Sequence, residues 1–420
     1  MNIRDLNGKS VAILGAHGRE GVAMQKALKQ FAPDAKISLR DMQDGDGYLD
    51  NLDQFDVLIK APGIPPHLIT NTGDAHVTNS TQIFLDSIDP QTTVIGVTGS
   101  KGKSTTASLI YAILKEAGKE AILLGNIGKP AISYLSQHSA LSTQHFVVLE
   151  LSSYQLMQVT SSPHIAVVTS FFPEHLDYHG SLENYKEAKK HVTKFQSSDD
   201  IVFYYKESDG AKEIANESAG SKVSYTEEDS LIAIIDTNLV GAHNLFNIAG
   251  SAAVARHLGI DDKTIVEAVR KFEGLPHRLK NLGKHHDIIW IDDAISTTPE
   301  STIAAIHSLT PNIKTIILGG QDRGNDFAQL GEVLAASGIE HVILMGESGP
   351  RIKEAITAPE IIIHEASSME EAVSIAKTEL KIASDSFPIA LLSPASPSYG
   401  MFKDFEEKGD VFKKCIENHA

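Results

Sequence analysis

The sequence predicts an α/β protein with three domains, in which helices cover mainly parallel sheets. Short apolar runs alternate with helical patterns along the whole chain, and Gly, Pro or polar turns bound several of these runs. Such alternation is typical of βαβ units and parallel sheets. The chain has 420 residues, which is too many for a single hydrophobic core.

Ten of the apolar runs are predicted as strands. One domain boundary is expected near residues 89–91, and another near 274–276, after a predicted helix. They divide the chain into an N-terminal domain (1–90), a central domain (91–274) and a C-terminal domain (275–420), each able to form its own α/β unit. The ten runs are 11–14, 57–59, 94–97, 146–149, 165–169, 288–291, 315–318, 341–345, 361–364 and 389–392.

Composition and charge disfavour several classes of protein. The formal net charge is −17, whereas broad contact with nucleic acid needs a basic surface. No apolar run is long enough to span a bilayer, and the N-terminus lacks the apolar region of a secretory signal, so we expect no membrane insertion. The single cysteine, Cys415, allows no intramolecular disulfide, and we expect it on a helix face rather than as a nucleophile. A cytoplasmic protein is the simplest expectation.

A glycine-rich loop at residues 98–105 predicts a nucleotide-phosphate site. It follows the β-branched run at 94–97 and opens a helix, so its backbone N–H groups can point at an anion. Lys103 would reach the β- and γ-phosphates, and the Ser104 hydroxyl would bind Mg²⁺. Val97 stands where the usual spacing of this motif has its first glycine. A glycine-rich turn without a ligand is the alternative.

Two turns in the N-terminal domain are candidate ligand sites. Residues 15–21 resemble a dinucleotide fingerprint, although Ala16 occupies the place of the second glycine. A turn-plus-helix anion site with Arg19 as an added cation is one interpretation, and a tight turn with no ligand is the other. Pro62 and Gly63 end a later strand, at a position where open α/β folds bind ligands.

Further polar side chains follow strands of the central domain. Glu150 comes directly after an apolar strand, where a phosphate-loop fold needs a Mg²⁺ ligand. Residues 174–179 hold two histidines and two acids, which fits a metal or phosphate role as well as a solvated loop. Asn244 and Asn247 lie one helical turn apart and could contact adenine, or Asn244 could cap the helix.

Three loops of the C-terminal domain each follow a predicted strand. They are residues 292–299, 319–327 and 393–400. Substrates bind at the carboxyl ends of strands in doubly wound sheets. Hydroxyl groups together with Arg323 would make a carboxylate pocket, because guanidinium pairs with carboxylate through two hydrogen bonds.

The order of these motifs resembles the Mur ligase family, and within it the enzymes that add glutamate to UDP-N-acetylmuramoyl-L-alanine. The resemblance extends over essentially the whole chain and implies a UDP-binding Rossmann-like domain, a central ATPase domain and a C-terminal Rossmann-like domain for the amino acid. The matching segments are the phosphate loop and residues 150–156, 175–177, 185–189, 241–247, 276–278 and 393–395.

The resemblance also implies ligands and site residues. ATP and two Mg²⁺ ions are implied, with Lys103, Glu150, His175 and Lys189 as the catalytic set. Ser104 and Glu150 would hold one ion, and His175 and a carbamylated Lys189 the other. The implied ATP contacts are Gly99, Ser100, Lys101, Gly102, Lys103, Ser104, Thr105, Asn244, Asn247, Arg278 and Asp293. The implied contacts to the UDP-sugar substrate are Arg19, Pro62, Gly63 and Asn126, and those to the amino acid are Thr297, Arg323, Ser398 and Phe405.

The implied reaction is ATP-dependent amide formation in peptidoglycan precursor synthesis, through an acyl phosphate, by a protein expected to be a monomer. D-Glutamate is the expected amino acid, but the pocket departs from the usual pattern. Ile295 and Arg323 stand where lysines are usual, Tyr399 replaces an aliphatic residue and Gly400 an acid. L-Glutamate or another acidic amino acid is therefore the alternative. The order Leu39-Arg40-Asp41 also differs from the usual uracil and ribose contacts.

Two other kinds of protein could carry a similar phosphate loop. Folylpolyglutamate synthetase and the diaminopimelate- or lysine-adding Mur ligases share the phosphate loop. The separate N-terminal domain before Val94 disfavours the former, and the shortness of that domain together with the Ser398 and Arg323 pocket disfavours the latter. A non-catalytic nucleotide-binding regulator is the rival of another class. The presence of Lys103, Glu150, His175 and Lys189 argues against it.

Overall fold

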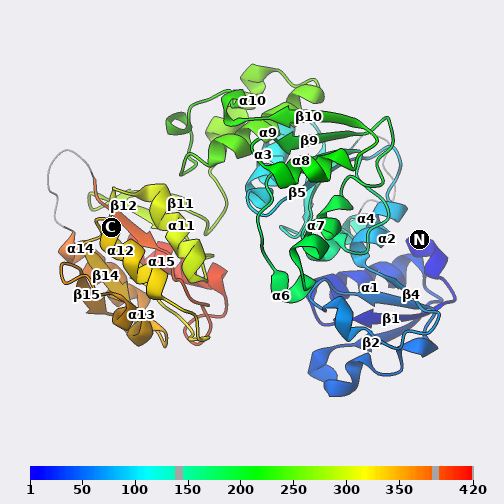
Figure 1. Cartoon of the computed structure of the whole chain (residues 1–420), viewed down its shortest axis with the longest axis horizontal. Coiled ribbons are helices and arrows are strands. Elements are labelled where there is room, and N and C mark those ends of the chain that lie inside the picture. Colours follow the sequence, from blue (N-terminus) through cyan, green and yellow to red (C-terminus); the bar gives the residue numbers. More distant parts are fainter. Residues whose placement is uncertain (138–144, 381–386, 419–420) are drawn as a thin grey trace. The chain divides into compact units, whose positions relative to one another are not determined.

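The computed structural model describes residues 1–137, 145–380 and 387–418, which form two compact units. One unit consists of Met1–Ala233 and Leu245–Val269, and the other of Ile234–Asn244 and Arg270–Ala420. The first carries two sheets and the second carries one (Figure 1). The predicted α/β class with parallel sheets is confirmed, while the boundaries near residues 90 and 274 stay predictions.

The N-terminal sheet has four parallel strands in the order β2-β1-β3-β4. Its central strand β1 is buried after its first residue, and the helix that follows starts at Arg19, so the predicted turn at 15–18 lies at the carboxyl end of the sheet. The elements are β1 (Ser10–Leu14), α1 (Arg19–Phe31), β2 (Lys36–Arg40), β3 (Val57–Lys60), β4 (His76–Thr78) and α2 (Ser80–Ser87).

The central sheet has six parallel strands in the order β10-β9-β8-β5-β7-β6. Strand β5 lies between β8 and β7, so the loops that follow these three strands meet at one edge. The strands are β5 (Thr93–Thr98), β6 (Ala121–Gly125), β7 (Phe146–Glu150), β8 (Ile165–Val168), β9 (Ile201–Tyr205) and β10 (Ser221–Tyr225). The helices are α3 (Lys103–Glu116), α4 (Ser133–Gln137), α5 (Ser153–Leu156), α6 (Leu176–His179), α7 (Leu182–Lys190), α8 (Asp209–Asn216), α9 (Asn244–His257) and α10 (Asp262–Lys271).

The C-terminal sheet has the order β11-β12-β16-β13-β14-β15, and its strands are parallel except β11, which is antiparallel to β12. Helices α11, α12 and α13 pack on one face, and α14 and α15 on the other, where Cys415 is buried as a helix-face residue (Figure 1). The strands are β11 (Lys280–His285), β12 (Ile288–Asp292), β13 (Ile313–Leu318), β14 (His341–Leu344), β15 (Ile362–Glu365) and β16 (Ile389–Leu392). The helices are α11 (Pro299–Leu309), α12 (Ala328–Ala336), α13 (Gly349–Ala355), α14 (Met369–Glu379) and α15 (Phe405–Glu417).

Each of the ten predicted runs forms a strand, and the described residues contain six further strands that were not predicted: β2, β4, β6, β9, β10 and β11. Short 3-10 turns occupy Ile3–Leu6, Met42–Asp44, Asp46–Leu49, Leu52–Gln54, Pro66–Leu68, Glu227–Asp229 and Ile234–Asp236. Within the described ranges, every helix is too short or too polar to cross a bilayer.

Candidate functional site

The loop between β5 and α3 has the geometry of a phosphate-binding turn. Gly99 and Gly102 have φ values of +148° and +86°. A Cβ on Gly99 would lie 2.0 Å from Thr169 Oγ1, and one on Gly102 would lie 2.3 Å from Asn247 Oδ1. Both positions therefore require glycine, because of backbone conformation and of space. The loop leads directly into the N-terminus of α3, which favours an anion.

The ammonium groups of two lysines donate hydrogen bonds to the carbonyl oxygen of Gly99, the first residue of this loop. Lys103 Nζ donates to Gly99 O at 3.0 Å and to Ser100 O at 2.7 Å. Lys189, on α7, donates from Nζ to the same Gly99 O at 2.7 Å, and its side chain is buried. Burial first, and then the nearby charge of Lys103, hold the pKa of Lys189 well below its usual range. Burial and the contact with the phosphate loop therefore distinguish Lys189 from the other lysines of α7.

Contacts along the rest of the loop fix its shape. Lys101 pairs with Glu174 at 2.7 Å through its ammonium group, and its N–H donates to Ser170 Oγ at 2.9 Å. The hydroxyls of Ser100 and Tyr185 are 2.9 Å apart. Ser104 and Thr105 follow in the first turn of α3, where Ser104 stays half-buried.

Glu150 lies beside this loop with one carboxylate oxygen unsatisfied. It ends β7 and pairs in register with Val97 of β5. Its side chain is buried, and Oε1 accepts a hydrogen bond from Asn126 Nδ2 at 3.1 Å. Oε2 is buried and has no hydrogen-bond partner in the described part of the chain. A buried carboxylate oxygen without a partner is costly unless a cation is bound there, so this residue fits a Mg²⁺ ligand.

His175 lies in an aromatic cluster near the same edge of the sheet. Its φ is +56°, and its ring centroid is 5.0 Å from that of Tyr154. Burial, opposed in part by Glu174, lowers the pKa of His175 and so favours the neutral imidazole that binds metals. His179 stacks on Tyr154 at 5.5 Å, and burial lowers its pKa to about 4.

An open pocket of about 640 Å³ lies within the same unit and brings together all four residues predicted for the UDP-sugar substrate. Arg19 is the one basic side chain among the described residues that line it. The pocket is large enough for a nucleotide-sized ligand. Its lining is Gly15, Gly18, Arg19, Glu20, Asp41, Met42, Gln43, Tyr48, Ala61, Pro62, Gly63, Ile64, Pro65, Leu68, Gly125, Asn126, Pro130, Ser152, Tyr154 and Gln155.

A buried lysine supports the Pro62–Gly63 turn of this pocket, and the sequence did not predict it. Lys60 Nζ donates to Ile64 O at 2.9 Å and to the Tyr178 hydroxyl at 3.1 Å. Tyr178 in turn donates to Pro62 O at 2.6 Å. Burial lowers the pKa of Lys60 to about 8. The one sequence signal was a lysine directly after a buried apolar strand.

The residues predicted to contact ATP are divided between the two units. Asn247 belongs to the unit of the phosphate loop, and its Oδ1 accepts from Thr106 Oγ1 at 3.1 Å. Asn244, Arg278 and Asp293 belong to the other unit, where Asn244 Nδ2 donates to Val240 O at 2.7 Å.

Asp293 is a buried acid at the end of the C-terminal sheet. It accepts hydrogen bonds from Leu279 N at 3.1 Å and from Ser393 Oγ at 2.8 Å. Burial nonetheless raises the pKa of Asp293 to about 6.

The three predicted loops of the C-terminal unit meet, because β12, β16 and β13 are adjacent in the sheet. Backbone hydrogen bonds join them: Ala395 N donates to Ser296 O at 2.9 Å, and Gly319 N donates to Pro394 O at 2.7 Å. Each of the three loops follows a strand, as the sequence predicted. The carboxyl edge of the sheet therefore presents one continuous loop surface.

The residues predicted for the amino acid lie on these loops and on the helix that follows. Arg323 is exposed, with its guanidinium 5.4 Å from the centroid of the Tyr399 ring. Ser398 is buried, and its hydroxyl has no partner within the described residues. Thr297 and Phe405, the first residue of α15, are half-buried. The loop is held by Arg351, which was not predicted and which pairs with Asp322 at 2.7 Å.

The chain is similar in sequence to known Mur ligase domains and to known ligases. Residues 97–231 match the Mur ligase middle domain, and residues 277–385 match the Mur ligase, glutamate ligase domain. A UDP-N-acetylmuramoylalanine–D-glutamate ligase from Acetivibrio thermocellus is 33% identical over 433 residues, which cover 94% of this chain and 89% of the relative. The protein of that name from Streptococcus mutans is 31% identical, with coverages of 98% and 97%.

The chain belongs to the Mur ligase family. It is an ATP-dependent, ADP-forming ligase, and the resemblance drawn from its motifs is confirmed. Solved Mur ligases share its fold at low identity. The UDP-N-acetylmuramate-alanine ligase MurC of Thermotoga maritima has a TM-score of 0.61 at 18% identity, covering 98% of this chain and 100% of that one. The MurF ligase of the same organism, in complex with ADP, has a TM-score of 0.59 at 18% identity, with coverages of 100% and 97%.

The residue clusters of this Mur ligase are distributed over its two units. The phosphate loop, Glu150, His175 and Lys189 lie in one unit together with the 640 Å³ pocket. The loops with Arg323 and Ser398 lie in the other unit. The residue roles stay predictions, which the geometry now allows to be tested one by one.

Proposed function

We propose that this Mur ligase joins D-glutamate to UDP-N-acetylmuramoyl-L-alanine, with ATP converted to ADP and phosphate, as a step of peptidoglycan precursor synthesis. Its relatives from Acetivibrio and Streptococcus carry the name of that activity at 31–34% identity. We further propose that it acts as a monomer in the cytoplasm, where ATP and UDP-activated sugars are made.

The observation that carries the proposal is the hydrogen bond between Asn126 and Glu150. Asn126 lines the 640 Å³ pocket, and its Nδ2 donates to Glu150 Oε1 at 3.1 Å. Glu150 adjoins the phosphate loop through its register with Val97. A sugar nucleotide held in the pocket can thus extend its acyl end towards the nucleotide phosphates. A binding protein for one nucleotide would need no such link between two sites.

In the first step the lactyl-alanine carboxylate attacks the γ-phosphorus of ATP, and ADP leaves. The Gly99–Thr105 loop would hold the phosphates through backbone N–H groups. Lys103 would turn from the loop carbonyls, 2.7–3.0 Å away, to the charge that develops on the transferred phosphoryl group. Arg19 would hold the substrate by its phosphates in the pocket.

The unsatisfied Glu150 oxygen and the neutral His175 fit a site for divalent cations. Ser104 and Glu150 would hold one Mg²⁺, and His175 and a carbamylated Lys189 would hold a second. When bound, these ions neutralise charge on the phosphates during transfer.

Lys189 has the environment that carbamylation needs. The reaction with CO₂ consumes the neutral amine, and burial favours that form. The amine nitrogen bonds to the carbon of CO₂ and loses a proton, which gives a carbamate anion. The product would place an anion beside Lys103 in place of a neutral amine, and so would attract the charge of that lysine.

In the second step the glutamate amine attacks the acyl carbon, and phosphate leaves. Arg323 and the Ser398 hydroxyl would bind the carboxylates of the amino acid. The exposed Tyr399 ring against Arg323 differs from the aliphatic contact expected from the resemblance. That change of pocket shape makes L-glutamate the alternative substrate.

The test measures phosphate release with ATP, Mg²⁺ and UDP-N-acetylmuramoyl-L-alanine while D-glutamate, L-glutamate and D-aspartate are supplied one at a time. We expect release and a product one glutamyl residue heavier with D-glutamate alone. Product with L-glutamate alone would support the ligase activity but change the configuration of the proposed amino-acid substrate. Phosphate release that needs neither the sugar nucleotide nor an amino acid would overturn the proposal.

A further inference from the structure

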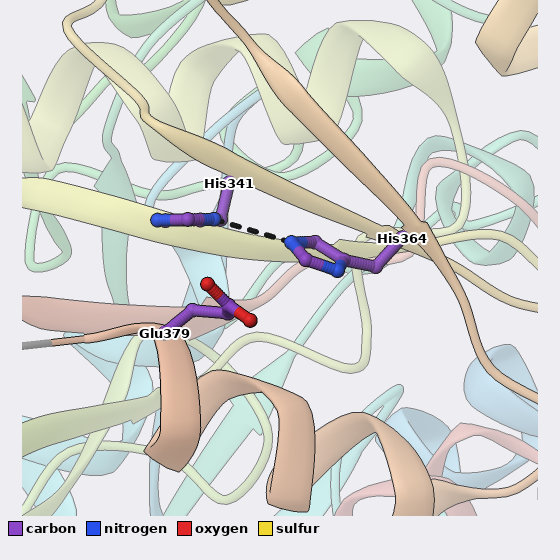
Figure 2. A group of neighbouring side chains, drawn as sticks. All are labelled: His341, His364 and Glu379. Carbon is purple, nitrogen blue, oxygen red and sulfur yellow. Dashed lines mark hydrogen bonds between the residues drawn. The ribbon is translucent and has the colours of Figure 1, made fainter.

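Two histidines and a glutamate converge in the C-terminal unit, away from the loops described above. They are His341 at the start of β14, His364 in β15 and Glu379, the last residue of α14. One ligand atom from each lies within 4.8 Å of the others. Figure 2 shows the Glu379 carboxylate facing the gap between the two rings.

The sheet register places these side chains on one face. Ile343 pairs with His364 across the parallel strands, and His341 precedes Ile343 by two residues. Since alternate residues of a strand share a face, both rings lie on the side of Ile343. Ile343 packs in the core with Val373 and Ala376 of α14. The last turn of that helix therefore delivers Glu379 to the histidines.

The spacing of the two rings matches that of neighbouring ligands on one metal ion. His341 Nδ1 and His364 Nε2 are 3.2 Å apart (Figure 2). Two nitrogens at about 2.0–2.1 Å from a tetrahedral Zn²⁺ are separated by about 3.3 Å. The same distance serves a hydrogen bond when one ring carries a proton between them. Loss of that proton would leave two lone pairs at the spacing that the metal requires.

We infer that His341, His364 and Glu379 form a Zn²⁺ site. Two imidazole nitrogens and one carboxylate are a donor set that Zn²⁺ accepts, with water as the fourth ligand. Glu379 also lies at the C-terminal end of α14, where the partial negative charge of the helix favours a cation. His341 is only 7% exposed, so the ion would be shielded on that side.

The site would be separate from the proposed reaction. His341 begins β14, whereas the loops with Asp293, Arg323 and Ser398 follow the carboxyl ends of other strands. A bound ion would tie the edge strand β15 and the end of α14 to β14. Binding should therefore stabilise the folded protein without any contribution from the substrates.

The test uses the full-length protein after removal of metals with a chelator. ZnCl₂ is titrated by calorimetry, and CoCl₂ is followed by its visible absorption, which reports coordination geometry. His364→Gln and Glu379→Gln remove one ligand each at partly exposed positions. We expect each to weaken the tightest Zn²⁺ binding by at least about tenfold and to abolish the rise in Tm that Zn²⁺ gives the parent protein.

Glu340→Gln is the matched control. Glu340 neighbours His341 and pairs with Lys314 at 2.7 Å, so its loss removes a local negative charge but no ligand. This variant should bind Zn²⁺ as the parent does. Because Glu150 and His175 could also take Zn²⁺, the comparison is repeated in Glu150→Gln, where the effect of His364→Gln should persist. Equal binding by the parent and by His364→Gln, with metal-free Tm values showing both folded, would reduce the cluster to a hydrogen-bonded histidine pair.

Discussion

Lys189 Nζ and Lys103 Nζ both donate to the carbonyl oxygen of Gly99, at 2.7 Å and 3.0 Å. Two full positive charges on one carbonyl repel each other, and in a buried site water screens that repulsion poorly. The arrangement becomes more stable when one lysine is neutral or modified. Lys189 is the more buried of the two and its pKa is well below the usual range, so it is the one to lose its charge.

Lys189→Ala should therefore abolish ligation in a way that small molecules can repair. We expect turnover to fall by about 10²–10³-fold, the scale seen when one charge-stabilising group is removed. Short carboxylates such as acetate or propionate should restore part of it, because they can occupy the space of the missing carbamate. The measurement is ADP release with saturating substrates, with and without each acid.

Lys186→Ala is the matched control on the same helix. Lys186 lies one turn before Lys189 on α7, and its ammonium group pairs with Glu213 at 2.6 Å. Its loss should leave turnover within about twofold and unaffected by added acids, since surface ion pairs contribute little. Full turnover in Lys189→Ala would rule out the carbamate.

Glu150→Gln should raise the Mg²⁺ concentration that half-saturates the enzyme. The amide keeps the shape of the side chain and can still accept from Asn126, but it removes the charge that the buried and unpartnered Oε2 offers. We expect kcat to fall about 10²–10³-fold and half-saturation to move to higher Mg²⁺. A Mg²⁺ titration of ADP release measures both. Glu187→Gln, which breaks the pair of Glu187 with Lys190, serves as control, and an unchanged Mg²⁺ dependence in Glu150→Gln would contradict the assignment.

The sequence predicted the edge strand β15 from its run of isoleucines, but the other nine predicted strands are buried at most of their positions. β7, for example, is buried at all five positions and reads as one apolar run. β10 is exposed at its first four positions, and β11 has a polar sequence and pairs antiparallel at the sheet edge. Strands of this kind carry no continuous apolar signal, so pattern alone could not separate β10 and β11 from loops.

Some features of the candidate site could likewise be predicted from the sequence, and others could not. Loops that follow neighbouring strands could be grouped from the sequence, because parallel topology brings the carboxyl ends of strands to one edge. The choice of Lys189 among the lysines of α7 could not be made, since it depends on a contact 90 residues away. The pairing of Lys60 with Tyr178 spans 118 residues and leaves no periodic trace.

Arg323→Ala should weaken glutamate binding while sparing the first half of the reaction. Arg323 is exposed at the carboxyl edge of the C-terminal sheet, on a loop held by the pair of Arg351 with Asp322. Hydrogen bonds to charged groups are worth about 1.5–3 kcal/mol, so KM for glutamate should rise at least about tenfold. KM for ATP and for the sugar nucleotide should stay unchanged in steady-state kinetics. Lys353→Ala, which breaks an exposed pair with Glu365, is the control, and a KM for glutamate that does not move would exclude Arg323 from the pocket.

Asp293→Asn should change how stability depends on pH. Burial raises the pKa of Asp293 to about 6 from its ordinary value of 3.8. Between these values the folded protein holds a proton that the unfolded chain has lost, so the stabilisation from Asp293 is full below pH 3.8 and is lost as pH rises through 6. Asparagine cannot titrate, yet it can accept from Leu279 N and donate to Ser393 Oγ.

The free energy of unfolding of Asp293→Asn, relative to the parent, should therefore increase by about 1.4 kcal/mol between pH 5 and pH 7.5, the equivalent of one pKa unit. Urea unfolding at both pH values measures it, and the difference between the two proteins removes the titration of every other group. Asp287→Asn is the control, because it removes a carboxylate of an exposed pair with Lys284 and leaves Asp293 in place. A difference for Asp293→Asn that does not change with pH would mean that Asp293 is ionised throughout this range, held so by the charge of Arg278 and by its hydrogen bonds.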